Sequence, residues 1–161
     1  MNIPEFVVLH HSYSPDNKIT SNWEGMERYQ ITERGMSEIA YNGGIEEVNG
    51  VLVYKVGRSI GKVGEHALGF NSRSIGLVAI GNFDDNPVPD LVWKVMLKVS
   101  AAWCILLGIP PEKVIGHRET YKMRGVPVEK QCPGKSWDMN KFRAELPDRI
   151  ALMKAALIMG S

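Results

Sequence analysis

Short apolar runs recur along the chain, and each is too short to form a buried helix. Runs that are rich in Val, Ile and Leu predict buried strands. The strands expected on this basis are Phe6–Leu9, Ile39–Ile45, Val51–Val56 and Ile75–Ile80. Asn49–Gly50 is a strong signal for a two-residue hairpin turn between the second and third of them. Gly43 and Gly44 interrupt the second, which predicts a bulge or a ligand that approaches the backbone.

Apolar residues at helical spacing predict a long helix in the second half of the chain. Leu91–Leu107 carries this periodicity most clearly, and Gly108 ends it. The region 137–158 predicts two C-terminal helices rather than one, the first of them capped by Ser136. The division is expected at Pro147, because proline suits the first turn of a helix and not its interior.

A shorter helix is expected near the start of the chain, from about Trp23 to Arg34. Ser21 and Glu24 before and within it have the spacing of a capping box. Strands that alternate with helices around one core indicate an α/β fold with a central mixed β-sheet flanked by helices. A chain of 161 residues suits one domain, so we expect residues 1–161 to form a single domain.

The composition is that of a globular domain, with 44% apolar and 23% charged residues. A formal net charge of +1 creates no overall field that would attract nucleic acid or lipid. No apolar run is long enough to span a bilayer, and Met1–Glu5 lacks the basic start of a signal peptide. We expect synthesis in the cytoplasm, a monomeric state, no nucleic-acid partner and no membrane insertion.

Three residues from distant parts of the chain form a candidate metal site. His10 ends the first predicted strand, His117 follows the apolar pair Val114–Ile115, and Cys132 lies in a basic, Gly- and Pro-rich segment that we expect to be a loop. Imidazole and thiolate are good ligands for zinc, and three protein ligands with a fourth position left for water are typical of a catalytic zinc site. The other cysteine, Cys104, lies in the long predicted helix and is expected to be a buried, inert thiol.

The first predicted strand ends in two histidines, His10 and His11. Neighbouring residues on a strand point to opposite faces of the sheet, so at most one of the two can bind the metal. The spacing alone does not say which histidine that is.

Several segments between Val7 and Gly134 carry a family resemblance. In chain order they are Val7–Ser12, Ala40–Asn42, Val63–Asn71, Ser74–Gly76, Ile80–Phe83, Gly116–Arg118 and Lys130–Gly134. These segments resemble the type-2 N-acetylmuramoyl-L-alanine amidases, which share a fold with the peptidoglycan recognition proteins and include small phage endolysins. The likeness covers roughly residues 6–134 in the right order, so it is specific, and the C-terminal helices at 137–158 add little to it.

The resemblance implies roles for the residues that match. It favours His10 over His11, and it implies one zinc ion held by His10, His117 and Cys132. Tyr41 and Lys130 match residues that support the chemistry. Tyr41 would orient water or pass a proton, and Lys130 would stabilise a tetrahedral oxyanion.

Three further residues are assigned to substrate binding. His66 matches a position that lines the peptide groove of the family, although hydrogen-bonded support of a loop is an equal alternative. Asn71 lies in the same matching stretch. Arg118 is one of several basic residues that either form a solvated face or attract the anionic cell wall.

The resemblance therefore predicts a zinc-dependent hydrolase that cuts the amide bond between N-acetylmuramic acid and L-alanine in peptidoglycan. The substrate comes from the resemblance, since zinc chemistry alone allows any amide. The absence of a signal peptide fits a phage or prophage endolysin that acts on the wall after release. It equally fits a cytoplasmic enzyme that recycles muropeptides.

Three other functions compete with this prediction, and for one of them, regulation by contact with another protein, no sequence feature indicates a partner. The domain could bind peptidoglycan without cleaving it, although Cys132 argues against this because purely binding members of the family typically lack that cysteine. Alternatively, Cys132 could be a nucleophile activated by His117, as in cysteine hydrolases. A chelator would distinguish the predicted zinc enzyme from a cysteine hydrolase, because it should inactivate the zinc enzyme and spare the thiol enzyme.

Overall fold

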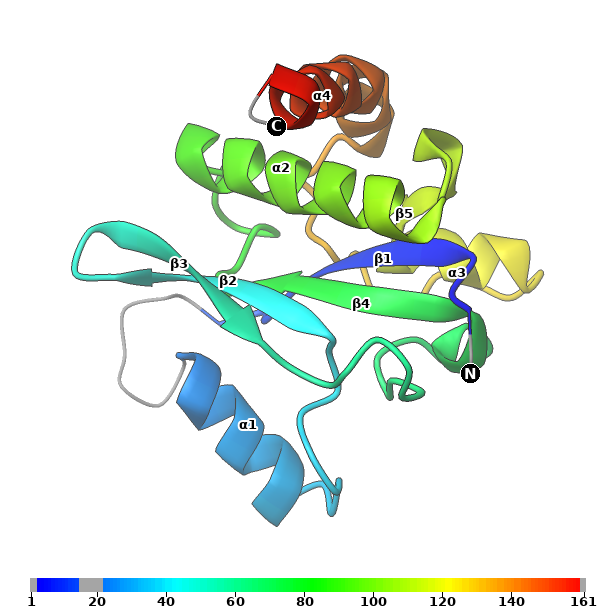
Figure 1. Ribbon diagram of the computed structural model, residues 1–161. Helices are drawn as coiled ribbons and strands as arrows, with labels where there is room; N and C mark the ends of the chain where they lie inside the picture. The colour runs from blue at the N-terminus through cyan, green and yellow to red at the C-terminus, as the bar shows by residue number, and fades with distance from the viewer. Residues whose placement is uncertain (1–2, 15–21, 160–161) are drawn as a thin grey trace.

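The computed structural model describes residues 3–14 and 22–159 and shows an α/β domain built on one five-stranded sheet (Figure 1). The strand order is β3-β2-β4-β1-β5. The strands are β1 (Phe6–His11), β2 (Gly43–Val48), β3 (Val51–Val56), β4 (Ser74–Ala79) and β5 (Val114–Gly116). β1 pairs in parallel with β4 and β5, and β2 with β4, whereas β2 and β3 are antiparallel. The prediction of a mixed sheet is confirmed.

Helices cover the two faces of the sheet unequally. They are α1 (Trp23–Thr32), α2 (Asp90–Leu107), α3 (His117–Met123) and α4 (Met139–Met159), with short 3₁₀ turns η1 (Asn71–Arg73) and η2 (Pro111–Lys113). In Figure 1, α2 lies along one face with α4 outside it, and α1 lies on the opposite side. The main core lies between the sheet and α2 and includes Leu9, Leu77 and Met96, all fully buried.

Alternate residues of β1 divide between the two faces. Val7 and Leu9 belong to the main core against α2. Val8 belongs instead to a smaller cluster on the other face, with Phe6, Ala67, Phe70 and Ile115. Because strand residues two apart share a face, His10 emerges on the same side as Val8, away from α2.

The strand expected at Ile39–Ile45 begins later than predicted, at Gly43. The glycine pair forms no bulge, since Gly43 pairs with Val56 and Gly44 with Lys55 in regular register. Both glycines make room for aromatic side chains. A Cβ at Gly43 would meet the ring of Tyr54, and one at Gly44 would meet Trp23. The predicted bulge or ligand approach was therefore wrong, and close side-chain packing explains the two glycines.

The hairpin predicted at Asn49–Gly50 is confirmed. Val48 pairs with Val51, and both turn residues have positive φ, 53° for Asn49 and 79° for Gly50. Positive φ at both central residues is what the favoured two-residue hairpin turn requires.

Four predictions for the helices need correction. The N-cap of α1 is Asn22, whose side chain accepts the Gly25 N–H at 2.8 Å, while the predicted cap Ser21 lies outside the described residues. The segment after His117, expected to be a loop, begins with helix α3. The C-terminal region forms one helix that passes through Pro147. Asp138, not Ser136, accepts the first backbone N–H groups of this helix.

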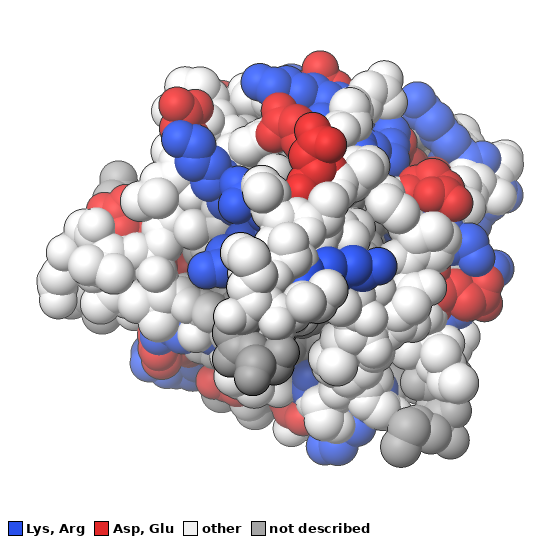
Figure 2. Space-filling model, turned by 45° about the horizontal axis from the view of Figure 1, so that its top comes forward, with Lys and Arg blue, Asp and Glu red and all other residues white. Residues whose placement is uncertain are grey.

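Charged side chains are intermixed on the surface shown in Figure 2, with basic and acidic groups side by side. This matches the near-neutral net charge of +1. Within residues 3–14 and 22–159, no helix is long and apolar enough to cross a membrane.

Candidate active site

His10, His117 and Cys132 meet at one place. Their ligand atoms all lie within 4.8 Å of one another, and Cys132 Sγ is 3.5 Å from His10 Nδ1. The sheet brings the two histidines together, because β1 and β5 are parallel neighbours and Leu9 pairs with Gly116. His10 directly follows Leu9, and His117 directly follows Gly116. The ring centroids of the two histidines are 4.7 Å apart. These three residues could hold a metal ion.

The start of α3 is braced so that His117 has a defined position. The Glu119 carboxylate accepts the Gly116 N–H at 2.8 Å and pairs with the Arg143 guanidinium of α4 at 2.8 and 3.0 Å. The Thr120 hydroxyl donates to the His117 carbonyl at 2.7 Å. A paired carboxylate and a hydroxyl thus fix the turn that presents the imidazole.

The His11 ring packs against Phe83 of the main core, although the residue also borders the cavity. Its ring stacks against Phe83 with centroids 6.1 Å apart, and its Nδ1 accepts the Phe83 N–H at 3.2 Å. This settles the choice that strand alternation left open. His10 is the histidine that joins the cluster, and His11 is a packed residue.

His66 contacts the nitrogen of His10 that faces away from Cys132. Its Nδ1 is 3.0 Å from His10 Nε2, and its Nε2 is 3.5 Å from the Ser74 hydroxyl. A proton on His10 Nε2, donated to His66, leaves the Nδ1 lone pair of His10 free to face Cys132 and a cation. Gly76 permits this arrangement, because a Cβ there would lie 2.7 Å from the His66 ring. His66 also lines the cavity, so it is hydrogen-bonded to two strand residues and borders the cavity at the same time.

Burial shapes the protonation of all three candidate ligands. Desolvation, reinforced by neighbouring His117, holds the pKa of His10 well below its ordinary value. Desolvation, with the charge of Lys130, lowers the pKa of His117 to about 4. Both imidazoles are therefore neutral near pH 7, the state that binds a metal. Burial raises the pKa of the Cys132 thiol to about 12, so its proton leaves when a cation binds.

The raised thiol pKa bears on the cysteine-hydrolase alternative. A nucleophilic cysteine is activated by a lowered pKa. Cys132 is buried and has the opposite shift. Two neutral nitrogens and one sulfur from three segments instead match the ligands that zinc prefers.

The cluster lies at the wall of a cavity of about 550 Å³. Tyr41 and Lys130 also line this cavity. The Tyr41 ring centroid is 5.0 Å from that of His10, and removal from water raises the pKa of its phenol, which therefore stays protonated. Lys130 is exposed and its positive charge reaches His10 and His117, whose pKa values it lowers.

Two residues predicted to bind substrate are placed elsewhere. Neither Asn71 nor Arg118 is among the described residues that line the cavity. The Asn71 side chain accepts the Ala67 N–H at 2.7 Å and closes the turn after His66. The Arg118 guanidinium donates to the carbonyls of Gln131, Gly134 and Trp137, and its backbone N–H donates to the Cys132 carbonyl at 2.8 Å. Both residues brace segments that carry site residues.

Several cavity residues were not predicted from the sequence. The C-terminal part of α1 and the segment after it contribute Gln30, Arg34 and Met36. Gln30 also accepts the Ala40 N–H at 2.7 Å, which holds the segment before Tyr41. A polar residue in an amphipathic helix carries no local signal of such a role, because its partner is ten positions away in the sequence.

The fold and the site define a class: an α/β domain that could hold a metal ion on two histidines and a cysteine, inside a cavity with a tyrosine and a lysine. The model of the N-acetylmuramoyl-L-alanine amidase family Amidase_2 matches residues 1–135. The chain therefore belongs to this amidase family.

Individual relatives agree with the family. The chain is 29% identical to peptidoglycan-recognition protein LB of Drosophila melanogaster over 140 residues, which is 80% of this chain and 54% of that protein. It is 27% identical to human N-acetylmuramoyl-L-alanine amidase over 137 residues, 80% of this chain but 22% of that protein. The structure of the endolysin amidase LysCS from Clostridium intestinale aligns with a TM-score of 0.71 at 23% identity, covering 90% of this chain and 84% of that one. The last comparison shows a shared fold. The chain spans about half of the Drosophila protein and about a fifth of the human one.

Proposed function

We propose that this protein is a zinc-dependent N-acetylmuramoyl-L-alanine amidase that hydrolyses the bond between N-acetylmuramic acid and L-alanine in peptidoglycan. The observation that carries the proposal is the convergence of His10, His117 and Cys132 within 4.8 Å in the cavity that also contains Tyr41 and Lys130. Membership of the amidase family supplies the substrate class.

His10, His117 and Cys132 would hold one zinc ion. When bound there, zinc supplies a Lewis acid that lowers the pKa of water and polarises an amide carbonyl. The chain prepares this site in the absence of the ion by keeping both imidazoles neutral and by placing His66 on the far nitrogen of His10.

The remaining groups act on the substrate. The Lys130 ammonium provides a cation for the negative charge that develops on the carbonyl oxygen, and a donor in this role contributes about 3–4 kcal/mol to transition-state stabilisation. Tyr41 keeps its hydroxyl proton because removal from water raises its pKa, so it can donate a hydrogen bond to the reacting groups. His66 serves the site through His10.

The decisive experiment combines metal analysis with mass spectrometry of digested cell wall. The purified protein should contain about one zinc per chain, and the digest should contain free L-alanine N-termini on intact glycan strands. Cys132→Ala should lose both zinc and activity. Cys104→Ala is the matched control, because Cys104 is a buried thiol of α2 outside the site.

Three results would overturn the proposal in different ways. Sedimentation with cell walls without any cleavage would indicate a binding module. Cleavage that survives a strong chelator would indicate an enzyme that does not need the metal. Products with cut glycan strands or cut peptide cross-links would indicate another bond.

We further propose that the protein is an endolysin of a phage or prophage that acts on the wall after release. The spacing of Lys130 and Cys132 resembles the phage enzymes of the family. An endolysin should digest intact sacculi at least as efficiently as soluble muropeptides. A strong preference for soluble muropeptides would favour the recycling enzyme instead.

A further inference from the structure

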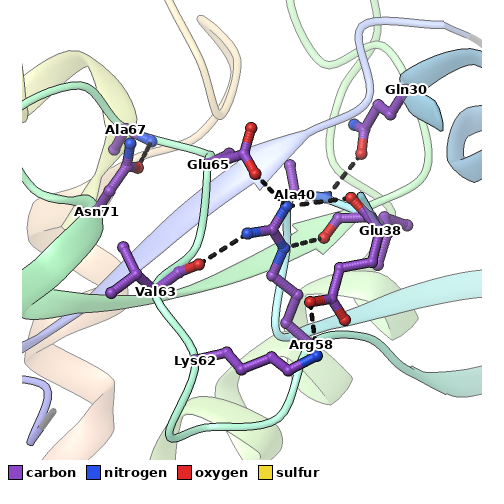
Figure 3. Close-up of polar contacts among 10 residues, drawn as sticks. Gln30, Glu38, Ala40, Arg58, Lys62, Val63, Glu65, Ala67 and Asn71 are labelled. Atoms are coloured by element: carbon purple, nitrogen blue, oxygen red, sulfur yellow. Dashed lines mark hydrogen bonds and ion pairs between the residues drawn. The ribbon is translucent and has the colours of Figure 1, made fainter. Parts of the chain in front are cut away.

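One buried arginine, Arg58, connects two loops of the candidate site. It follows β3, and its side chain is 5% exposed. Its Nε donates to the Ile39 carbonyl at 2.6 Å, Nη1 to the Val63 carbonyl at 2.7 Å, and Nη2 to the Glu38 carbonyl at 3.1 Å. Nη2 also pairs with the Glu65 carboxylate. Figure 3 shows the guanidinium between the two segments, with contacts on both sides.

The two segments carry residues of the site. Glu38 and Ile39 immediately precede the stretch that ends in Tyr41, and Val63 to Glu65 immediately precede His66. Backbone hydrogen bonds continue the connection, from the Arg58 N–H to the Tyr41 carbonyl at 2.9 Å and from the Glu65 N–H to the Ala40 carbonyl at 3.1 Å. Arg58 therefore sets the distance between the loop of Tyr41 and the loop of His66.

The side chains at the ends of these loops both lie next to one candidate ligand, His10. Ring centroids of Tyr41 and His66 are 5.0 and 5.1 Å from that of His10, and they are 6.3 Å from each other. A shift of either loop would move the phenol away from the cluster or break the 3.0 Å contact between His66 and His10.

An arginine suits this task for a physical reason. Its planar guanidinium carries five donors in a rigid fork and can hold several carbonyls in fixed directions at once. Lysine has the same charge but presents a single compact ammonium. Burying a charge is costly unless it is paired and hydrogen-bonded, and here the carbonyls and Glu65 supply those partners.

We propose that Arg58 is a positioning residue of this site, which holds the Tyr41 hydroxyl and the His66 imidazole in place around His10. The effect on turnover rests on the amidase activity proposed above. The effect on His66 and His10 is independent of any substrate and is read from zinc affinity.

The first test compares Arg58→Lys with the wild type. We expect kcat on a muramyl-peptide substrate to fall about 10- to 100-fold with little change in KM, as for other residues that orient metal ligands. Zinc affinity, measured by competition with a chromogenic chelator, should weaken by a similar factor. The matched control is Lys62→Gln, which removes the exposed Lys62–Glu38 ion pair that also joins the two segments. It should leave kcat, KM and zinc affinity unchanged.

A double-mutant cycle separates positioning from general stability. In a Tyr41→Phe background the hydroxyl is absent, so with zinc in saturating excess Arg58→Lys should cost much less in kcat than it does in the wild type. If the two substitutions act independently, their effects on kcat multiply, and the proposed action through Tyr41 is wrong.

Thermal unfolding of each variant shows whether the variant is folded. Should Arg58→Lys not fold, Glu65→Gln replaces it, because this change leaves the guanidinium in place and removes only the negative charge of its partner, a carboxylate that is 45% exposed. A smaller fall in kcat and in zinc affinity is then expected. Folded variants that match the wild type in both measurements would overturn the inference. If the wild type cleaves no amide, the proposed function fails and zinc affinity alone decides the role of Arg58.

Discussion

Two lysines of the same cavity, Lys130 and Lys135, differ in what surrounds them. Lys130 and Lys135 are both exposed and both line the cavity. The charge of Lys130 lowers the pKa values of His10 and His117, so it acts electrostatically on two candidate ligands, and the proposed mechanism assigns it to the oxyanion. Lys135 instead donates its backbone N–H to Asp84 at 2.9 Å, which ties this part of the loop to another segment.

Lys130→Ala is therefore expected to lower kcat about 100- to 1000-fold, the usual cost of removing one oxyanion donor. Lys135→Ala should change kcat far less, although it removes the same charge from the same cavity. Steady-state kinetics on a soluble muramyl peptide would compare the two. Equal losses would mean that the cavity needs positive charge in general and not a donor at Lys130.

Arg118 illustrates how a basic residue in a basic segment can be structural. Its guanidinium holds three backbone carbonyls around the loop of Cys132, and charged hydrogen bonds contribute about 1.5–3 kcal/mol each. Arg118→Ala should therefore lower the free energy of unfolding by roughly 2–4 kcal/mol. Urea denaturation would measure this, with Lys122→Ala as the control because Lys122 is an exposed basic residue of the same helix. A stable Arg118→Ala protein with weakened binding to anionic walls would restore the original wall-binding hypothesis.

Among the elements, β1 and β5 do most to create the site. Their parallel pairing places the residues after Leu9 and Gly116 side by side, and α3 starts at that point with His117. The C-terminal helix α4 contributes from a distance, because its Arg143 holds Glu119 at the start of α3. An element with little resemblance to the family therefore helps to position a candidate ligand.

The continuity of α4 through Pro147 makes a prediction for this helix. Proline lacks the N–H that would bond to the Arg143 carbonyl one turn earlier, and it costs up to about 3 kcal/mol in a helix interior. Pro147 is exposed, so Pro147→Ala should raise the free energy of unfolding by about 1–3 kcal/mol. Denaturant unfolding and far-ultraviolet circular dichroism would follow the change. Destabilisation would show instead that Pro147 begins a separate helix, as first predicted.

For the molecule as a whole, the two faces of the sheet have different tasks. The face toward α2 is the main apolar core, with Val7, Leu9 and Leu77 fully buried. The opposite face carries His10 and His66, two buried imidazoles. Placing several neutral histidines together in the fold makes stability depend on pH.

The metal-free protein should lose stability in acid. Folding lowers the pKa of His10, and lowers those of His66 and His117 to about 3 and about 4, all mainly through desolvation. As the pH falls below the ordinary value of 6.5, the unfolded chain takes up protons that the folded protein excludes. The free energy of unfolding therefore decreases from about pH 6.5 down to about pH 3, the folded-state pKa of His66, by about 1.4 kcal/mol for each unit of pKa separation.

Urea titrations between these pH values, with a chelator present, would measure this dependence. His66→Gln removes one of the titrating groups and should flatten the curve relative to the wild type. Identical curves for the two proteins would show that carboxylates, and not the buried histidines, control acid stability.

Much of the fold was predictable from local pattern. The continuous apolar runs predicted β1 and β4, Asn49–Gly50 predicted the hairpin, and Leu91–Leu107 predicted α2, because each signal depends on residues that are neighbours in the chain. The errors arose where a distant partner decides the outcome. Glycine is needed at positions 43 and 44 because the rings of Tyr54 and Trp23 pack against them, and not because a ligand approaches.

The class of fold, the candidate ligands His10, His117 and Cys132, and the family of the chain were all predictable from the amino-acid sequence. Residue type, spacing and the resemblance of several segments in the right order suffice for these, since they follow from the chemistry of side chains and from short-range order. Three other features became visible in the folded chain alone: His11 packs against Phe83, Arg118 and Asn71 hold loops in place, and Arg58 joins the loops of Tyr41 and His66. Those roles depend on which backbone groups lie opposite a side chain, and strand pairing between remote segments sets that arrangement.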